Sequence, residues 1–427
     1  MSRIASVTTA SALLVAIAFA PLSSARAAGS TPTFVALPLE RALDLAGSRS
    51  ASVLRAIANV RQREAELQIA RLSLLPSATA AYALAPQAGA TTSSTIAQHS
   101  WTVGAGISIS DLVSGSATIR SAAATLLAAQ RDADAAVLAE RERTIKLYFG
   151  ALQACAAQQL RAQLVEGAAA DRDAAAVRMQ KGDAPRLDLV RADVSLAQAH
   201  AELARATAQR DDAVAALASE TGVDPASLTE ISEGVPLQGH NRASSLTPDD
   251  AARRAVASRP EIASLRAQLQ ARQADLGAAR ASAFPKLTAG AGYQWGVDSG
   301  QQANGTEAAI NLELPLGFTF TPRTQIAQAE ISATSADLDE TIRSIALSAA
   351  SATRDANAAA VALDASLSAR DQARDALHAI QTGYRQGASS SLDVGEARRT
   401  YVQASLDALA AQYDRAQADA ILEIEVP

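Results

Sequence analysis

Residues that commonly carry chemistry are few in this chain, and their spacing matches no catalytic or metal-binding motif. The chain has four histidines, at His99, His200, His240 and His378. None belongs to a His-Glu-x-x-His motif or to a cluster with metal-ligand spacing. The only cysteine, Cys155, lies among alanines, as expected of a small packing residue. Gly104 and Gly106 lie inside a predicted strand and not in a phosphate-binding loop. The sequence therefore predicts no enzyme activity, no cofactor and no metal site.

Three acidic residues have an informative spacing. Asp188 and Asp393 each follow a glycine, Gly182 or Gly387, by six residues. Glu396 follows Asp393 by three residues, which places both on one face of a helix. An acid at the start of a helix caps its first turn or is stabilised by the helix dipole. A structural role at a helix start is therefore one interpretation, and any further role depends on the elements that position these acids.

The N-terminus has the features of an export signal. Arg3, an apolar run at residues 11–20 and the small residues around Arg26 predict a signal peptide at residues 1–27. That run is too short to span a bilayer, and no other apolar run is long enough. Removing two arginines from the 38 basic residues leaves 36 against 44 acidic ones, a net charge of −8. Without a basic excess, nucleic acid is not an expected partner.

Two long segments organise the chain. Residues 115–181 are rich in helix-forming residues and free of proline after Gly115, which predicts one helix of about 67 residues, or about 100 Å. Leu138, Ile145 and Leu152 recur in sevens, and this seam favours helical partners. Residues 322–386 form the second long helix. Turns at the two glycines lead into shorter helices at residues 187–220 and 392–422.

The chain also repeats itself. Residues 37–82 align with residues 246–291 at a constant shift of 209, and a shift of 205 pairs Gly182 with Gly387. We interpret this as a duplication, with repeats at residues 28–245 and 246–427. Each repeat has a helix, at 50–75 or 261–284, then a β-hairpin, at 77–110 or 286–316, and then the two helices described above. Residues 221–259 link the repeats as a strap around the middle, and an equatorial linker at 221–245 closes the first repeat.

The hairpin segments have two different faces. From Trp101 to Ser110 every odd position is apolar and every even one is Thr, Gly or Ser, and residues 287–297 alternate as cleanly. The polar segments 87–100 and 298–306 are the expected turns. Such strands favour a transmembrane barrel, which needs more than four strands to close. Three chains would supply twelve, and the residues available for a membrane aromatic belt are Tyr82, Trp101, Tyr293 and Trp295. The alternative is a soluble sheet that caps a helical bundle.

The order of these elements, their duplication and the segment Gly383-Tyr-Arg-Gln-Gly-Ala-Ser-Ser-Ser-Leu-Asp-Val394 resemble the TolC-type outer-membrane efflux protein family, the outer membrane factors. The resemblance implies a mainly α fold with a membrane β-barrel portion. Long α-helical hairpins would form a trimeric α-barrel, topped by a 12-stranded β-barrel with four strands per protomer. It implies a place in the outer membrane of a Gram-negative bacterium, extending into the periplasm.

The same resemblance implies the exit duct of a tripartite efflux or type I secretion system. The partners would be two further copies of the chain, a periplasmic adaptor, an inner-membrane transporter and outer-membrane lipid. The alternatives are a periplasmic adaptor or a soluble helical-bundle binding or structural protein. An adaptor would need one helical hairpin flanked by small β-domains, whereas this chain has two hairpins.

The resemblance also assigns roles to residues at the hairpin tips. The expected adaptor-docking residues are Lys181, Gly182, Asp183, Ala184, Gln386, Gly387, Ala388 and Ser389. Asp393 and Glu396 match the acidic rings that narrow the periplasmic entrance in the family. Tyr384 and Asp188 match a hydrogen-bonded pair that holds this entrance closed. The family's second restraining residue is an arginine, and here that position is Ser389.

Overall fold

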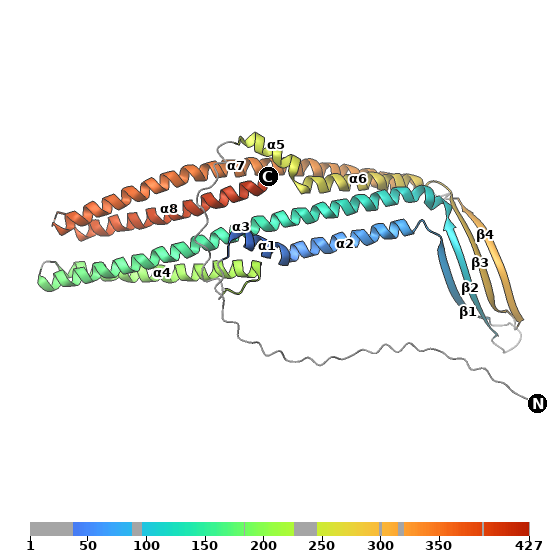
Figure 1. Cartoon of the computed structure of the whole chain (residues 1–427), viewed down its shortest axis with the longest axis horizontal. Helices are drawn as coiled ribbons and strands as arrows, with labels where there is room; N and C mark the ends of the chain where they lie inside the picture. Colours follow the sequence, from blue (N-terminus) through green and yellow to red (C-terminus); the bar gives the residue numbers. More distant parts are fainter. Residues whose placement is uncertain are drawn as a thin grey trace, which may run out of the picture.

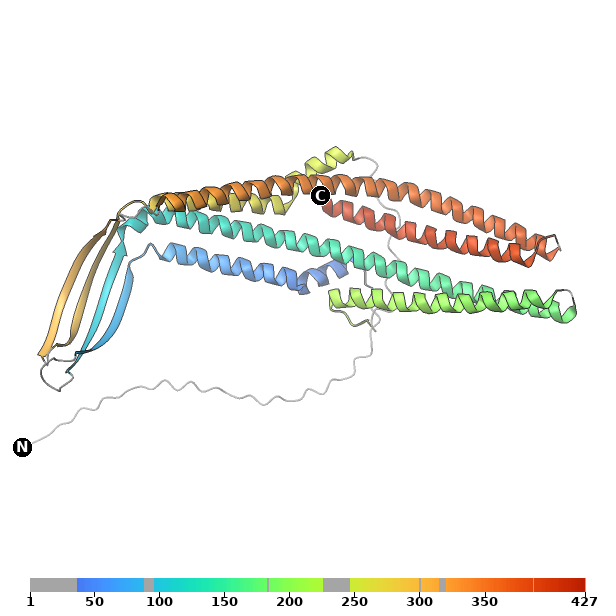
Figure 2. The same cartoon turned by 180° about the vertical axis from the view of Figure 1, so that it is seen from behind.

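The computed structural model describes residues 37–87, 96–182, 184–225, 246–298, 301–314, 320–386 and 388–426. The signal peptide expected at residues 1–27 and most of the linker expected at residues 221–245 lie outside this part of the chain. The molecule is a long bundle of helices with a sheet at one end and two helical hairpin tips at the other (Figures 1 and 2). The expected fold class, long helical hairpins joined to a small sheet, is confirmed.

Two helices run the length of the bundle. They are α3, Ile109–Lys181, with 73 residues, and α7, Phe320–Arg385, with 66 residues. The chain reverses at the tips into α4, Arg186–Thr221, and α8, Ser391–Glu425. Toward the sheet, the long helices are accompanied by α2, Ala51–Leu72, and α6, Pro260–Ala281. Each pair of shorter helices lies end to end along its long helix (Figure 1).

Two short helices at mid-rod were not predicted. They are α1, Leu39–Arg49, and α5, Pro248–Ser258. The segment predicted as a strap, residues 221–259, therefore contains a helix, α5, that was not predicted from the sequence. Its polar residues start a helix, because Thr247 accepts a hydrogen bond from the N–H of Asp250 and Pro248 occupies the first turn. The helix stops before Pro260, since proline disfavours the helical conformation in the residue that precedes it.

The sheet has four antiparallel strands in the order β1-β2-β3-β4. Their bounds are β1 Ser77–Gln87, β2 Ile96–Ser108, β3 Lys286–Asp298 and β4 Gln301–Glu313. β4 starts inside the turn predicted at residues 298–306, because Asp298 already pairs with Gln301. β2 likewise starts before the end of the turn predicted at 87–100. Pairing with a neighbouring strand overrides the low strand propensity of these polar residues.

Strand pairing confirms that the sheet has two different faces. Tyr82 pairs with Trp101, and Trp101 pairs with Trp295, so these side chains lie on one face. Val103 and Tyr293, the next pair on that face, are also apolar. The opposite face carries mainly Gly, Thr, Ser, Gln and Ala on the first three strands, and it also carries Glu307, Asn311 and Glu313 on β4. Within the residues that the structure describes, no helix is long and apolar enough to cross a membrane.

The core lies at mid-rod, where α1 and α4 meet α3. Ile145 and Leu152, from the heptad seam predicted on α3, are buried there together with Leu217 of α4. Tyr148 is fully buried and donates a hydrogen bond to the carbonyl of Leu37 at 3.0 Å. Cys155 packs against this cluster, and burial raises the pKa of its thiol, as suits a packing residue. A second, alanine-rich cluster joins α5, α7 and α8 at the equivalent place.

Candidate functional site at the hairpin tips

The first tip is a sharp turn between α3 and α4. Gly182 has a left-handed backbone, with φ 80° and ψ 9°, which glycine adopts without the steric cost that a side chain would bring. Its N–H reaches the carbonyls of Arg178 and Met179, and α3 ends there. The helix-ending role expected of Gly182 is therefore confirmed. Asp183 and Gly387, two of the predicted docking residues, lie outside the described residues.

The second tip begins its return helix with a capping box. The N–H and the hydroxyl of Ser390 each donate to Oδ2 of Asp393 at 2.8 Å, and the N–H of Asp393 donates to Oγ of Ser390 at 3.2 Å. The backbone hydrogen bond and then the hydroxyl of Ser390 lower the pKa of Asp393. Asp393 therefore stays a carboxylate at neutral pH. Glu396, one turn along α8, is exposed.

Asp188 occupies the corresponding third position of α4, yet its surroundings differ. The residue that caps α4 is Pro185, which has no N–H and no side-chain acceptor, so a capping box cannot form. Asp188 forms an ion pair with Arg191, at 3.8 Å, and only 14% of its side chain is exposed. The two acids that the repeat makes equivalent are thus held in different ways.

Tyr384 connects the two hairpins of one chain. It lies in the last turn of α7, and the guanidinium carbon of Arg178, on α3, lies 4.4 Å from the centre of its ring. Such a cation–π contact is worth about 0.5–1 kcal/mol at exposed sites. The hydrogen-bonded pair of Tyr384 and Asp188 stays a prediction, and the contact found here gives Tyr384 an additional partner.

A second link joins the hairpins further from the tip. Arg398 of α8 forms an ion pair with Asp171 of α3 and donates to the carbonyl of Gly167 at 3.4 Å. Burial lowers the pKa of the Arg398 guanidinium. Because both partners belong to α3, this link holds α8 against the first hairpin.

Ser389, at the position where the resemblance implies a restraining arginine, packs within its own hairpin. A side chain added at Gly383 would bring its Cβ to 2.6 Å from Oγ of Ser389. The N–H of Ala388 also donates to the carbonyl of Gly383 at 2.8 Å. Glycine at position 383 therefore allows the turn to fold closely onto the end of α7.

Two segments of the chain, residues 42–223 and 251–423, match the family model described as outer membrane efflux protein. Together they cover most of the described residues. The chain belongs to this family. The family consists of efflux proteins and not of enzymes, and it places the chain in the outer membrane with its helices extending into the periplasm.

Relatives of this efflux protein are distant in sequence. It is 27% identical to Protein CyaE of Bordetella pertussis over 316 residues, which span 71% of this chain and 66% of the relative. The solved CmeC outer membrane channel of Campylobacter jejuni has a TM-score of 0.78 at 18% identity, and covers 91% of this chain and 85% of its own. The open-state MtrE outer membrane channel of Neisseria gonorrhoeae has a TM-score of 0.75 at 23% identity, with coverages of 91% and 89%. These two likenesses show the shared fold.

The aromatic residues predicted for a membrane belt gather in one place on the sheet of this efflux protein. The ring centres of Tyr82 and Trp101 lie 4.8 Å apart, those of Trp101 and Trp295 6.3 Å, and those of Trp295 and Tyr293 6.0 Å. All four side chains are exposed. They form one continuous aromatic row across three strands.

Sequence reasoning missed the residues that join the hairpins of this efflux protein. Arg178, Arg398 and Asp171 carry no signal in the sequence, because their partners lie on other helices. The capping box at Ser390 was readable, since a serine three residues before an acid is a helix-start pattern.

Proposed function

We propose that three copies of this chain form the exit duct of an outer-membrane export system. One observation carries the proposal: a four-stranded sheet with one apolar, aromatic face lies at the end of two helical hairpins from the outer membrane efflux protein family. The sheet would supply the wall within the membrane, and the helices would continue the duct into the periplasm.

Open strand edges support assembly of three chains. β1 and β4 are the outer strands of the sheet and each leaves one row of backbone groups unpaired along its edge. An unpaired edge is not tolerated in lipid, whereas a closed barrel of twelve strands pairs every edge. The exposed apolar residues Val103, Tyr293 and Ile310 would then face lipid.

The hairpin tips supply the surface for the proposed partners. An inner-membrane transporter and its periplasmic adaptor would approach from the periplasm, where small residues at the turns allow close contact. Gly182 and Ala388 are exposed there, and so are Leu187 and Leu392 at 54% and 55%. Apolar side chains exposed beside a turn of small residues suit packing by the helices of an adaptor.

Asp393 and Glu396 would form the acidic entrance of this duct. The lowered pKa of Asp393 keeps it charged at the pH of the periplasm, and threefold symmetry would bring three copies together. Two unit charges ~6 Å apart repel by about 3 kcal/mol at an effective dielectric near 20. Such a ring attracts cations. Tyr384 and Asp188 would restrain the entrance, with Arg178 as the contact that fixes the Tyr384 ring.

Purified protein in detergent and in planar bilayers tests this function. We expect light scattering to give three times the mass of the mature chain, and single channels to prefer cations. The double variant Asp393→Ala with Glu396→Ala should remove that preference, because it removes the acidic ring. Asp407→Ala, which removes an exposed acid elsewhere on α8, is the matched control and should leave selectivity unchanged. A monodisperse monomer without channel activity would refute the duct.

A further inference from the structure

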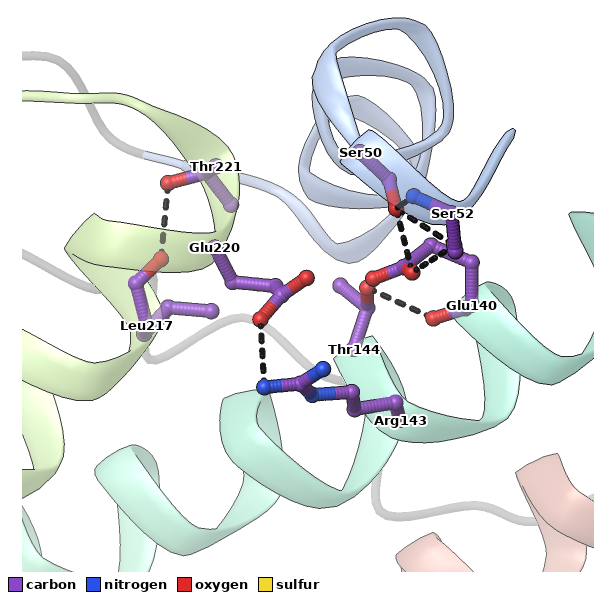
Figure 3. A network of polar contacts seen from close by, with 8 residues as sticks. All are labelled: Ser50, Ser52, Glu140, Arg143, Thr144, Leu217, Glu220 and Thr221. Carbon is purple, nitrogen blue, oxygen red and sulfur yellow. Dashed lines mark hydrogen bonds and ion pairs between the residues drawn. The ribbon is translucent and has the colours of Figure 1, made fainter. Parts of the chain in front are cut away.

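A polar cluster lies at mid-rod, where the start of α2, the middle of α3 and the end of α4 meet (Figure 3). Ser50 caps α2, and its hydroxyl donates to Oε2 of Glu140 at 2.6 Å. Ser52 donates to the same oxygen at 3.0 Å. Glu220, in the last turn of α4, points its carboxyl group toward that of Glu140 (Figure 3). The cluster therefore places two carboxyl groups face to face at a joint between helices.

Both carboxyl groups are shielded from solvent. Glu140 is 4% exposed, and the side chain of Glu220 is 13% exposed. Within the described residues, no N–H or hydroxyl group donates to Oε1 of Glu140. The carboxyl group of Glu220 faces that of Glu140 instead (Figure 3). Two carboxylates cannot hydrogen-bond directly, so a hydrogen bond between these two groups requires that one of them carry a proton.

The cations near the pair do not replace that proton. Nη2 of Arg143 lies 3.1 Å from Oε2 of Glu220, but 67% of the Arg143 side chain is exposed, so water screens its charge. Arg49 of α1 donates to the carbonyls of Thr221 and Gly222 at 3.2 and 2.7 Å and thereby satisfies the end of α4. One exposed cation therefore serves two buried carboxyl groups.

The environment separates the pKa values of the two acids. The hydrogen bond with Glu140 raises the pKa of Glu220, burial and the charge of Glu140 raise it further, and Arg143 opposes them in part. Burial alone would raise the pKa of Glu140, but the hydrogen bonds from Glu220, Ser50 and Ser52 and the charge of Arg143 outweigh it, so its pKa is lowered. Of the two groups, Glu220 therefore holds a proton more readily than Glu140.

We propose that Glu140 and Glu220 share one proton, and that this proton fastens the end of α4 to the joint between α1 and α2. Glu220 holds the proton and donates it in a hydrogen bond to Glu140. When the proton leaves, two carboxylates face each other in a buried place, and α4 is pushed away from the joint. This latch depends on the contacts within one chain and not on the proposed duct.

The two pKa shifts set the pH range of the latch. The raised pKa of Glu220 gives a stability that is fully present below its unfolded-state pKa and is lost as the pH rises through its folded-state pKa. The lowered pKa of Glu140 gives a stability that is present above its unfolded-state pKa and is lost as the pH falls through its folded-state pKa. The contact between Glu140 and Glu220 therefore stabilises the fold most at pH values between their two folded-state pKa values. This stabilisation is lost as the pH rises above the folded-state pKa of Glu220.

Infrared spectroscopy in heavy water detects the proton directly. We expect the purified protein to keep the C=O band of one protonated carboxyl per chain at pH values where ordinary glutamates, with a pKa of about 4.3, have ionised. Glu220→Gln should remove this band. A band that titrates with the ordinary carboxyls, or that persists in Glu220→Gln, would overturn the proposal.

Heat unfolding at several pH values tests the latch itself. The amide introduced by Glu220→Gln keeps a hydrogen-bond donor toward Glu140 and cannot ionise. This variant should therefore match the wild type at pH 5 and unfold at a higher temperature than the wild type at pH 8. Glu425→Gln is the matched control, because Glu425 is the equivalent residue of the second repeat and pairs with Arg259. This control should unfold at a lower temperature than the wild type at pH 8.

Two outcomes would contradict the latch. If the unfolding temperatures of the wild type and of Glu220→Gln depended equally on pH, Glu220 would lose no proton in the pH range measured. Stabilisation of the wild type by added magnesium, absent in Glu220→Gln, would mean that the two carboxylates hold a metal ion and not a proton.

Discussion

At mid-rod, each repeat has a joint between two successive helices with a buried acid beside it, and the two repeats neutralise this acid in different ways. A shift of 209 makes Ser50 equivalent to Arg259, and each is the residue between two successive helices. Their backbones agree, with φ −57° and ψ 129° at Ser50 and φ −67° and ψ 128° at Arg259. A shift of 205 makes Glu220 equivalent to Glu425, each at the end of a returning helix. The joints therefore share a backbone and one acid.

The residues around that acid differ. In the second joint Arg259, whose side chain is 9% exposed, forms ion pairs with Glu425 and Glu261. In the first joint a serine, Ser50, stands in place of the arginine, and its hydroxyl donates to the buried Glu140. A buried acid is neutralised by a fixed cation in one repeat and by a proton in the other.

Removal of the fixed cation should have the largest effect. Arg259→Met leaves Glu425 and Glu261 without their buried counter-charge, and breaking a buried ion pair in this way costs about 3–5 kcal/mol. We expect urea titration to show this loss of stability at pH 8. Arg253→Met, which removes an exposed ion pair with Asp250, is the control and should change little. A loss as small as that of the control would show that the second joint does not rely on its cation.

The anchor of the N-terminal segment comes next. Tyr148 donates to the carbonyl of Leu37 inside the first core. Tyr148→Phe leaves a buried carbonyl without a donor, which costs about 1–3 kcal/mol. Urea titration should show this loss, whereas Tyr82→Phe, at an exposed tyrosine, should show none. Equal stabilities of the two variants would mean that the Leu37 carbonyl finds another donor.

Exchange of the joint residues tests the comparison itself. Ser50→Arg with Glu140→Ala gives the first joint the arginine of the second and removes Glu140, so Glu220 faces a cation and no second acid. The raised pKa of Glu220 should then fall. The pH-dependent part of the stability, which is worth about 1.4 kcal/mol for each pKa unit, should fall with it. Heat unfolding between pH 5 and pH 8 measures this. If the unfolding temperature of the variant depended on pH as much as that of the wild type, this pH dependence would not originate in the first joint.

Local sequence patterns predicted much of the fold and little of the joint. Alternation predicted the two faces of the strands, and the spacing of Asp393 from Gly387 predicted an acid at a helix start, because these features depend on neighbours along the chain. The start of α2 was predicted within one residue, at Ser50, whereas the short helix α1 before it was missed. Glu140 and Glu220 lie on different helices, so only tertiary packing brings them together. The same holds for Arg178 and Tyr384 at the tips.

The smallest change in stability should come from Arg143→Ala. Its ion pair with Glu220 is largely exposed, and such pairs contribute about 0–1 kcal/mol. Its charge nevertheless opposes the raised pKa of Glu220. We therefore expect the variant to keep the shared proton to a higher pH, so that the infrared carboxyl band titrates later than in the wild type. Lys146→Ala, which removes an ion pair with Glu142 on the same helix, should leave that titration unchanged. If the carboxyl band of Arg143→Ala titrated at a lower pH than that of the wild type, Arg143 would stabilise the protonated pair through contacts other than its charge. The first joint would then depend on its arginine, as the second joint does.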